Sequence, residues 1–462
     1  MKRLLIAALA IVVVAAIVVY LVARQQLGSG LLRTQLEQQL SVRLGEPVRI
    51  GAARARLFPG LAVDLLDVTV GQASSLHLGS IRVFTGLRAL FGDAIDIRRI
   101  NVSDARPGGP GSPVSFDMDA SLLGDRLDVP RLTIRGPTTR LEAKGTLTSI
   151  ANVQGTFEAR TDRLDLSELV AMAAAVAPPR PRTRDTRPSP MHLSVRLTTP
   201  ILRFGGDEFR DLSTSIDATS GRVAMNPLGL RLFGGTFKGR LDADTRNDTP
   251  VLRLTGALAD LDVVDLLKRT GSAGGITGHL SGDVSLSAQG NDGTALMRSA
   301  RGSIAALVRN GSLPHLDMVR TIVLAFGKPS NDAPAGSGTA FDTLSGTFAL
   351  ASATLRTDNL TLRSRDVDTN GRGMLNVDSG SVDARTDVIL SRDLTAQAGS
   401  DLRRYAQQDG RVIVPATVGG TLDHPSVFID VTAAAKRAFE NEVKRRATDF
   451  IGGLFKKKKG GG

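Results

Sequence analysis

The chain has 462 residues, a formal net charge of +12 and no cysteine. The lack of cysteine excludes disulfides, thiol catalysis and cysteine-based metal sites. Excess positive charge suits nucleic acid, but sixteen Phe, two Tyr and no Trp cannot supply the rows of stacking rings that single-strand binders use. We therefore expect no nucleic-acid partner, and we expect either several domains or an elongated repetitive body.

The N-terminal stretch from Leu4 to Ala23 consists of twenty residues without a charge, a Gly, a Pro or an amide. At about 1.5 Å per residue, such a helix covers the roughly 30 Å of a hydrocarbon core. Lys2 and Arg3 precede it, which predicts a cytoplasmic N-terminus and a long remainder on the far side of the membrane. The alternative is a cleaved signal peptide, whose apolar region is about 7–15 residues long. The longer run favours an uncleaved transmembrane anchor within residues 1–27.

The next segment changes from a helical to a strand pattern. Leu32, Leu36, Leu40 and Leu44 recur every four residues, which predicts a short amphipathic helix that docks the body beside the anchor. From residue 46 onward, apolar residues alternate with polar ones over short runs separated by Gly and Pro, which is typical of antiparallel strands with one apolar face. Residues 28–177 are therefore expected to form a first β-rich region.

Residues 178–190 are rich in Pro and Arg, which predicts a linker. This linker either loops out from the body or divides it. Strand patterns resume on its far side, in a middle region over residues 191–275 and a last region over residues 276–432. Leu261-Asp262-Val263 repeats Leu164-Asp165-Leu166 at an offset of 97 residues (261 − 164). In both places an acidic residue is expected to follow a strand and begin a short helix, where negative charge suits the helix N-terminus.

The C-terminal residues 433–462 predict an amphipathic helix with a basic tail. Between Lys436 and Lys459 there are nine Lys or Arg and three Asp or Glu, a net charge of +6. This segment either caps the last sheet edge in solvent or binds an anionic membrane surface or an acidic partner. For the second case, the candidate contacts are Lys456, Lys457, Lys458 and Lys459.

The sequence contains no recognisable motif of catalytic residues. The five histidines are far apart, and there is no HExxH, GxSxG or P-loop motif. Asp366 to Gly371 fits the first half of a calcium loop, but the position of the bidentate Glu is Val377, so we favour an Asn-Gly hairpin turn. We expect no enzyme, cofactor or metal site; an envelope hydrolase is the remote alternative.

Several segments, taken in their order along the chain, resemble the AsmA-like family of bacterial envelope proteins. The apolar N-terminal run and the Leu-rich helix come first. Further matching segments are Gly45-Glu-Pro-Val-Arg-Ile50, Phe58-Pro-Gly-Leu-Ala-Val-Asp-Leu-Leu-Asp-Val68, Leu232-Phe-Gly-Gly-Thr-Phe-Lys-Gly239 and Val414-Pro-Ala-Thr-Val-Gly-Gly-Thr-Leu-Asp-His-Pro425. The order of these segments extends over nearly the whole chain.

The resemblance implies a single-pass inner-membrane protein with its bulk in the periplasm. The expected fold is mainly β, an elongated, repetitive antiparallel sheet that curls into a U-shaped groove, with a few short helices. The resemblance further implies that the groove carries phospholipid toward the outer membrane, with an outer-membrane or other envelope protein as a possible partner. The alternative is an assembly factor for outer-membrane biogenesis whose sheets pack as a closed sandwich.

The alternation of apolar and polar residues also indicates which side chains lie on the apolar face, whether that face lines an open groove or the core of a sandwich. The groove candidates are Leu252, Leu254, Val284, Leu286, Val382, Val388, Val427 and Ile429.

Overall fold

The structure, a computed structural model, describes a large part of the chain. The described residues are 46–56, 61–71, 76–85, 97–150, 152–168, 191–204, 206–247, 249–268, 274–326, 338–397 and 407–430, with single positions between 33 and 42 and at 436 and 443. Among them, no helix is long and apolar enough to cross a membrane. The anchor predicted within residues 1–27, the linker 178–190 and the lysines at 456–459 lie outside the described residues.

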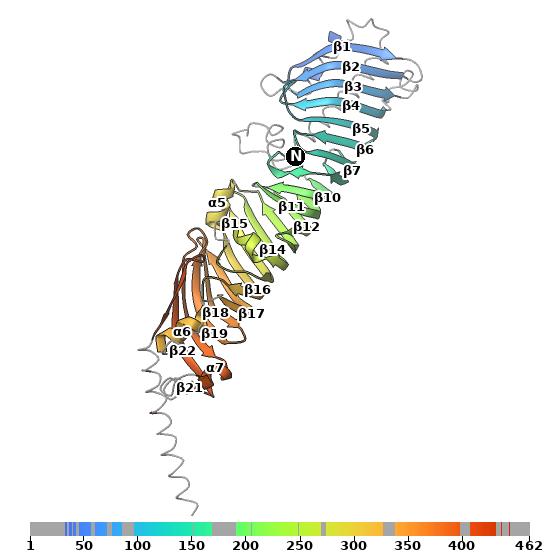
Figure 1. The fold of residues 1–462 in the computed structure, drawn as a ribbon. Coiled ribbons are helices and arrows are strands. Elements are labelled where there is room, and N and C mark those ends of the chain that lie inside the picture. Colours follow the sequence, from blue (N-terminus) through green and yellow to red (C-terminus); the bar gives the residue numbers. More distant parts are fainter. Residues whose placement is uncertain are drawn as a thin grey trace, which may run out of the picture. The chain divides into compact units, whose positions relative to one another are not determined.

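The body is mainly β, as the sequence predicts, and divides into two compact units (Figure 1). Unit 1 comprises residues 1–231 and 240–248, and unit 2 comprises residues 232–239 and 249–462. Strand β13 (Gly235–Asp244) contributes residues to both units.

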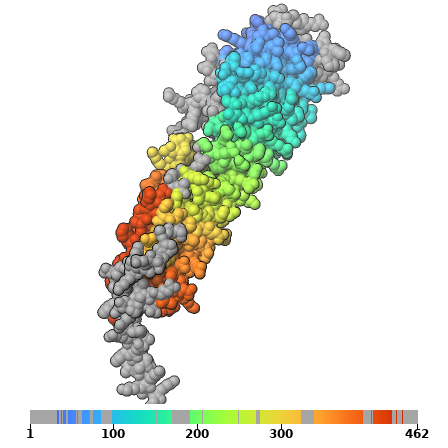
Figure 2. Space-filling view, viewed as in Figure 1, coloured from blue at the N-terminus to red at the C-terminus, as the bar shows by residue number. Residues whose placement is uncertain are grey.

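Unit 1 is a sheet whose strands pair in the order in which they occur along the chain, so that colours follow one another from blue to green over its surface (Figures 1 and 2). Its strands are β1 (Val48–Arg56), β2 (Leu61–Val70), β3 (Leu76–Thr85), β4 (Ile97–Pro107), β5 (Ser115–Leu123), β6 (Arg126–Arg135), β7 (Arg140–Ser149), β8 (Gln154–Thr161), β9 (Leu164–Asp165), β10 (His192–Phe204), β11 (Asp207–Thr219) and β12 (Arg222–Leu232). Neighbours are antiparallel except around β10.

Strand β10 pairs with β8 and β9 in parallel, which departs from the purely antiparallel sheet that we expected. A parallel pair needs a crossover of about a dozen residues or more, and the chain between residues 166 and 191 is long enough. The strands on either side of the Pro-rich segment are therefore direct neighbours, and this segment does not divide the sheet.

The two faces of the unit 1 sheet differ in polarity. On one face, apolar side chains oppose each other across the strands, as in the pairs Leu65 with Ile81 and Val83 with Ile100. Both isoleucines and Val83 are fully buried. The opposite face carries cross-strand ion pairs, among them Arg131 with Asp119 at 2.7 Å. This is the one-sided pattern that alternation predicts.

A crease crosses the first four strands of unit 1, where the alternation shifts by one residue. Asp67 and Asp104 lie there with φ of 53° and 52°, a left-handed conformation that Asp tolerates better than most residues. Glycines oppose them: a Cβ on Gly51 would lie 2.9 Å from the Cβ of Asp67, and one on Gly79 would lie 3.1 Å from that of Asp104. The shift returns apolar residues to the same face beyond the crease.

Unit 2 also consists of sheet strands that pair largely in chain order, and its described residues include four short helices (Figure 1). Its strands are β14 (Val251–Asp262), β15 (His279–Gln289), β16 (Arg301–Leu313), β17 (Thr339–Ala351), β18 (Thr354–Arg363), β19 (Val367–Asn376), β20 (Val382–Leu390), β21 (Gln407–Gln408), β22 (Arg411–Gly420) and β23 (Pro425–Ile429). The helices are α4 (Val263–Leu267), α5 (Gly293–Ser299), α6 (Met318–Phe326) and α7 (Arg392–Gln397).

The sheet of unit 2 curls around its apolar face. The loop before β23 reaches the segment after α4, where the N–H of Gly274 donates to Asp423 Oδ1 at 3.3 Å and a Cβ on Gly275 would lie 2.2 Å from the carbonyl oxygen of Leu422. Leu313 of β16 packs against both the cluster of β16 to β18 and the cluster of β19, β20 and β22, so the apolar faces of these strands turn toward each other. The apolar face is therefore the inner face of a curved sheet.

A Leu-Asp pair, with the leucine buried, begins each of these helical turns, as the internal repeat predicts. The carboxylate of Asp262 caps α4 by accepting from the N–H groups of Val264 and Asp265. Asp165 accepts in the same way from the two residues that follow Leu166. A third case is Asp317, which accepts from Arg320 N–H before α6. Each cap satisfies N–H groups that a helix start leaves unpaired.

The Asn-Gly turn expected within residues 366–371 is wrong. Asn370 and Gly371 lie inside β19, paired with Thr361 and Leu360 of β18. The strand pattern on both sides, which we interpreted as two strands of a hairpin, belongs to one strand. Glycine is tolerated there because the neighbouring backbone comes close: a Cβ on Gly371 would lie 2.3 Å from the carbonyl oxygen of Arg385.

Candidate functional site

The inner face of unit 2 carries a line of small side chains that runs across six strands, which we name the small-residue row. Gly282, Ala306 and Gly346 oppose one another on β15, β16 and β17. The row continues on β18, β19 and β20, where the cross-strand partners are Thr357, Gly373 and Ala384. The part of the row on β15 to β17 meets the part on β18 to β20 between Gly346 and Thr357: a Cβ on Gly346 would lie 3.2 Å from Thr357 Oγ1.

Large apolar side chains border this row on both sides. Residues two positions away along each strand share the face and lie about 6.8 Å from the row. One wall consists of Val284, which is buried, and of five half-buried residues, Ile304, Phe348, Leu355, Leu375 and Val382. The other wall consists of Leu280, Val308, Leu344 and Leu362. We name the small-residue row with its two apolar walls the trough; Gly346, Thr357 and Ala384 on its floor are buried.

The glycines of the row let neighbouring groups lie directly against the strand backbone. A Cβ on Gly282 would lie 1.9 Å from the carbonyl oxygen of Ala305, so no larger residue fits there without a shift. The ring of Phe348 lies beside Gly346, with Cε2 3.2 Å from the position of a Cβ. The same arrangement recurs at Gly256, where the ring of Phe237 lies 2.7 Å from that position.

Helix α4 covers one wall of the trough. Its first residue, Val263, is buried in a cluster with Val308, Phe341 and Leu362, and Leu267 packs against the same cluster. The wall under α4 is thus closed, and the half-buried wall on the other side of the small-residue row remains accessible.

Helix α6 covers the far strands of the inner face. Met318 and Ile322 are buried against β20 and β22, in a cluster that includes Val388 and Val414. The hydroxyl of Thr339 holds the start of the helix, accepting from Met318 N–H at 2.9 Å and donating to the carbonyl oxygen of Leu316 at 2.5 Å. Helices α4 and α6 therefore lie on the same side of the small-residue row.

All eight groove candidates from the sequence lie on this inner face. Leu254 opposes Leu286, and Val388 opposes Val414, so each pair belongs to the same surface. The structure separates the candidates into two groups. Beside the trough lie Leu252, Leu254, Leu286 and Val382, which are half-buried, and Val284, which is buried. In the cluster under α6, or packed against it, are Val388, Val427 and Ile429.

The small residues of the trough were not found from the sequence, although they leave a signal. Alternation identifies large apolar residues, and we did not consider glycines within strands. A Gly inside a strand indicates a bulge or the close approach of another group. Each of β15, β17 and β19 has such a glycine on its apolar face, at Gly282, Gly346 and Gly373.

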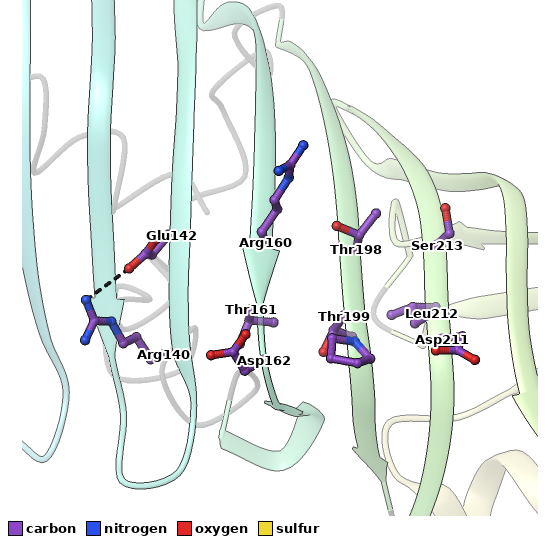
Figure 3. Close-up of a pocket in the computed structure, with 11 residues that line it drawn as sticks. Arg140, Glu142, Arg160, Thr161, Asp162, Thr198, Thr199, Asp211, Leu212 and Ser213 are labelled. Carbon is purple, nitrogen blue, oxygen red and sulfur yellow. Dashed lines mark hydrogen bonds and ion pairs between the residues drawn. The ribbon is translucent and has the colours of Figure 1, made fainter.

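Unit 1 contains two polar hollows, which differ from the trough. One, of about 560 Å³, is lined by residues at β7, β8, β10 and β11 (Figure 3). Arg140 and Glu142 form an ion pair of 3.0 Å at its side, and Arg160 and Asp162 add further charge. The other, of about 680 Å³, contains Lys144, Glu158 and Arg196 among its lining residues. In both, most of the lining residues are polar or charged.

Two histidines that the sequence separates are neighbours in the structure. The rings of His315 and His424 have centroids 6.4 Å apart. Within the described part of the chain, however, no group of three or more His, Asp or Glu side chains is placed to hold a metal ion. Both calcium ligation at residues 366–371 and a histidine metal centre lack a geometric basis there.

The comparison with known families decides the assignment. Residues 125–363 match the AsmA family, which is 239 of 462 residues, or just over half of the chain. The chain belongs to the AsmA family. The match confirms the resemblance inferred from the sequence and includes the small-residue row as far as β18. Neither the curated proteins nor the solved structures yielded a match.

Proposed function

We propose that this AsmA-family chain is an inner-membrane-anchored periplasmic protein that provides an apolar trough for phospholipid moving toward the outer membrane, without enzymatic chemistry. The observation that carries the proposal is the half-buried wall beside the small-residue row of unit 2. Apolar side chains such as Ile304 and Leu355 remain partly exposed on the inner face of a curved sheet. An acyl chain is an occupant that would remove this surface from water.

The hydrophobic effect explains why such a trough suffices for transport. A two-chain phospholipid has roughly thirty methylenes, and at about 0.8 kcal/mol each their exposure to water costs on the order of 20 kcal/mol. Free diffusion between membranes is negligible at that cost. An apolar surface that the tails can follow lowers the barrier, because it replaces water along the path, and this requires no catalytic residue.

One polar group on the inner face also suits a lipid. The side chain of Thr386 is buried next to the trough, and its Oγ1 has no hydrogen-bond partner among the described residues. A buried hydroxyl without a partner costs about 1–3 kcal/mol. An ester or phosphate oxygen of a lipid would accept a hydrogen bond from this hydroxyl.

A second function is supported by a different part of the molecule. In unit 1, apolar side chains of β2 to β4 such as Ile81 and Val102 have 0 % and 1 % exposure, which is the burial of a closed core. A closed β body would suit an assembly factor that works through its outer surface. A closed body would require protein side chains to bury the apolar wall of the trough in unit 2 completely. Residues of that wall such as Ile304 and Leu355 are only half-buried.

A matched pair of substitutions on β16 tests the proposal. Ala306→Leu fills the small-residue row, while Ala305→Leu adds the same side chain to the exposed opposite face. Native mass spectrometry of the full chain, released from membranes in minimal detergent, should show bound phospholipid in the wild type and in Ala305→Leu. Ala306→Leu should lose most of it with its circular dichroism unchanged. A wild-type protein without phospholipid would favour the assembly factor.

A further inference from the structure

The basic residues of unit 1 are unevenly distributed among its strands. Strands β1 to β4 contain seven Arg and three Asp, a net charge of +4. Strands β5 to β8 contain six Lys or Arg and five Asp or Glu, a net charge of +1. The excess charge therefore lies at the end of the sheet that is nearest in sequence to the apolar N-terminal stretch.

Four of these arginines occupy two adjacent rows on the polar face, and we name them the arginine patch. In the first row Arg54 opposes Asp64, which opposes Arg82. The second row begins at Arg56 and ends at Arg99 on β4, with uncharged residues between them. With strands about 4.8 Å apart, the patch extends about 14 Å across the sheet.

Among the described residues, a single carboxylate is paired with the arginine patch. Asp64 is 5 % exposed and is held by Arg56 at 2.9 Å and by Arg82 at 2.5 Å. Arg54 and Arg99 are exposed and have no acidic partner among the described residues. The patch thus presents four guanidinium groups against one buried carboxylate, which is already engaged.

The polar face of the following strands is built differently. There, charges meet in cross-strand or near-neighbour pairs, such as Arg135 with Asp117 and Lys144 with Glu158. Those pairs neutralise each other within the fold. The unbalanced charge of the arginine patch does not stabilise the fold in this way, because like charges on one surface repel each other. An anion bound from outside the protein would neutralise it.

We propose that the arginine patch docks unit 1 on the phosphate groups of an anionic membrane surface. The inference rests on the membrane anchor of the proposed function, because β1 begins only 25 residues after Ala23 (48 − 23). Guanidinium groups bind phosphate oxygens in pairs of hydrogen bonds, and their charge is retained at any physiological pH. Docking would hold the first strands against the membrane from which lipid is taken.

The absence of cysteine makes a direct test simple. Ser103 is exposed on the polar face of β4, four residues from Arg99, and a Ser103→Cys variant carries one thiol in the chain. We would label it with an environment-sensitive fluorophore and insert the full chain into phosphatidylcholine nanodiscs with and without phosphatidylglycerol. The fluorescence should change only with phosphatidylglycerol, and added salt should reverse the change.

The double substitution Arg54→Ser/Arg99→Ser should weaken this docking equilibrium by about thirtyfold. The control Arg131→Ser/Arg140→Ser removes the same charge from β6 and β7 and should leave docking unchanged. An equal response of both variants, or no response to phosphatidylglycerol, would overturn the proposal. Phospholipid in the trough is measured in the same samples, so loss of docking with retained lipid refutes this inference alone, and failure to enter nanodiscs refutes the anchor.

Discussion

The first strands of unit 1 and the middle strands of unit 2 share one design but differ in how their apolar face is filled. Both alternate apolar and polar residues and pair in chain order. In β2 to β4 the apolar face carries Val, Leu and Ile without glycine, and Ile81 and Ile100 are fully buried. In β15 to β19 glycines interrupt the large residues, and Phe348 and Leu355 are half-buried.

The difference indicates that alternation and residue size carry separate information. Alternation determines which face of a strand is apolar. The placement of glycine determines whether that face packs as a core or leaves a trough. The comparison predicts that the same substitution has opposite consequences in the two regions.

The largest effect is expected for a charge in the closed region. Ile81→Asp places a carboxylate at a fully buried position between the apolar side chains of Leu65 and Val102. It should destabilise unit 1 by about 4 kcal/mol or more, and thermal unfolding by circular dichroism should show the loss. A folded Ile81→Asp protein would mean that β3 lines an open surface like that of unit 2.

The same charge in the open region should spare the fold. Leu286→Asp lies on the half-buried face of β15, where water can reach the carboxylate, so the melting temperature should change little. Bound phospholipid should fall about tenfold or more, because a charge beside an acyl chain costs more than 1.4 kcal/mol. Ser285→Asp, on the exposed face of the same strand, is the control and should keep its lipid. Unfolding of Leu286→Asp would instead indicate a closed sandwich.

A smaller effect is expected at the helix that covers the closed wall of the trough. Asp262→Ala removes the cap of α4 and should destabilise that helix by about 1 kcal/mol. Hydrogen exchange should rise at Val264 and Asp265, whose N–H groups lose their acceptor. Asp265→Ala leaves the cap intact and should show much less exchange; equal exchange in both variants would argue against capping by Asp262.

The smallest effect concerns pH and the polar face of unit 1. A hydrogen bond from Lys144 lowers the pKa of Glu158, with the charge of the same lysine as the next cause. A lowered carboxylate pKa stabilises the fold above the ordinary value of about 4.3, and that contribution is lost as the pH falls through the lowered value. Glu158→Gln should therefore lower the melting temperature slightly at about pH 6, and this decrease should become smaller as the pH falls below the ordinary pKa of Glu. An equal decrease above and below that pKa would contradict this assignment.

Much of the fold follows from local sequence signals. Alternation places Val382 and Val388 on one apolar face, and both lie in β20; the Leu-Asp repeat predicts the helical turn that forms α4. The parallel pairing of β8 with β10 was missed because register across a long connection has no local signal. The small-residue row was missed for a similar reason: Gly282, Ala306 and Gly346 align only when three strands pair in one register.

The central claim is that acyl chains occupy the trough of unit 2 and not the closed face of unit 1. Photo-crosslinking with a phospholipid that carries a diazirine in its acyl chain, followed by peptide mass spectrometry on the full membrane-inserted protein, tests it directly. The account predicts crosslinks on β16 to β18, at Ile304, Phe348 and Leu355, which line the half-buried wall. Crosslinks confined to β1 to β6, or their absence from the whole body, would contradict it.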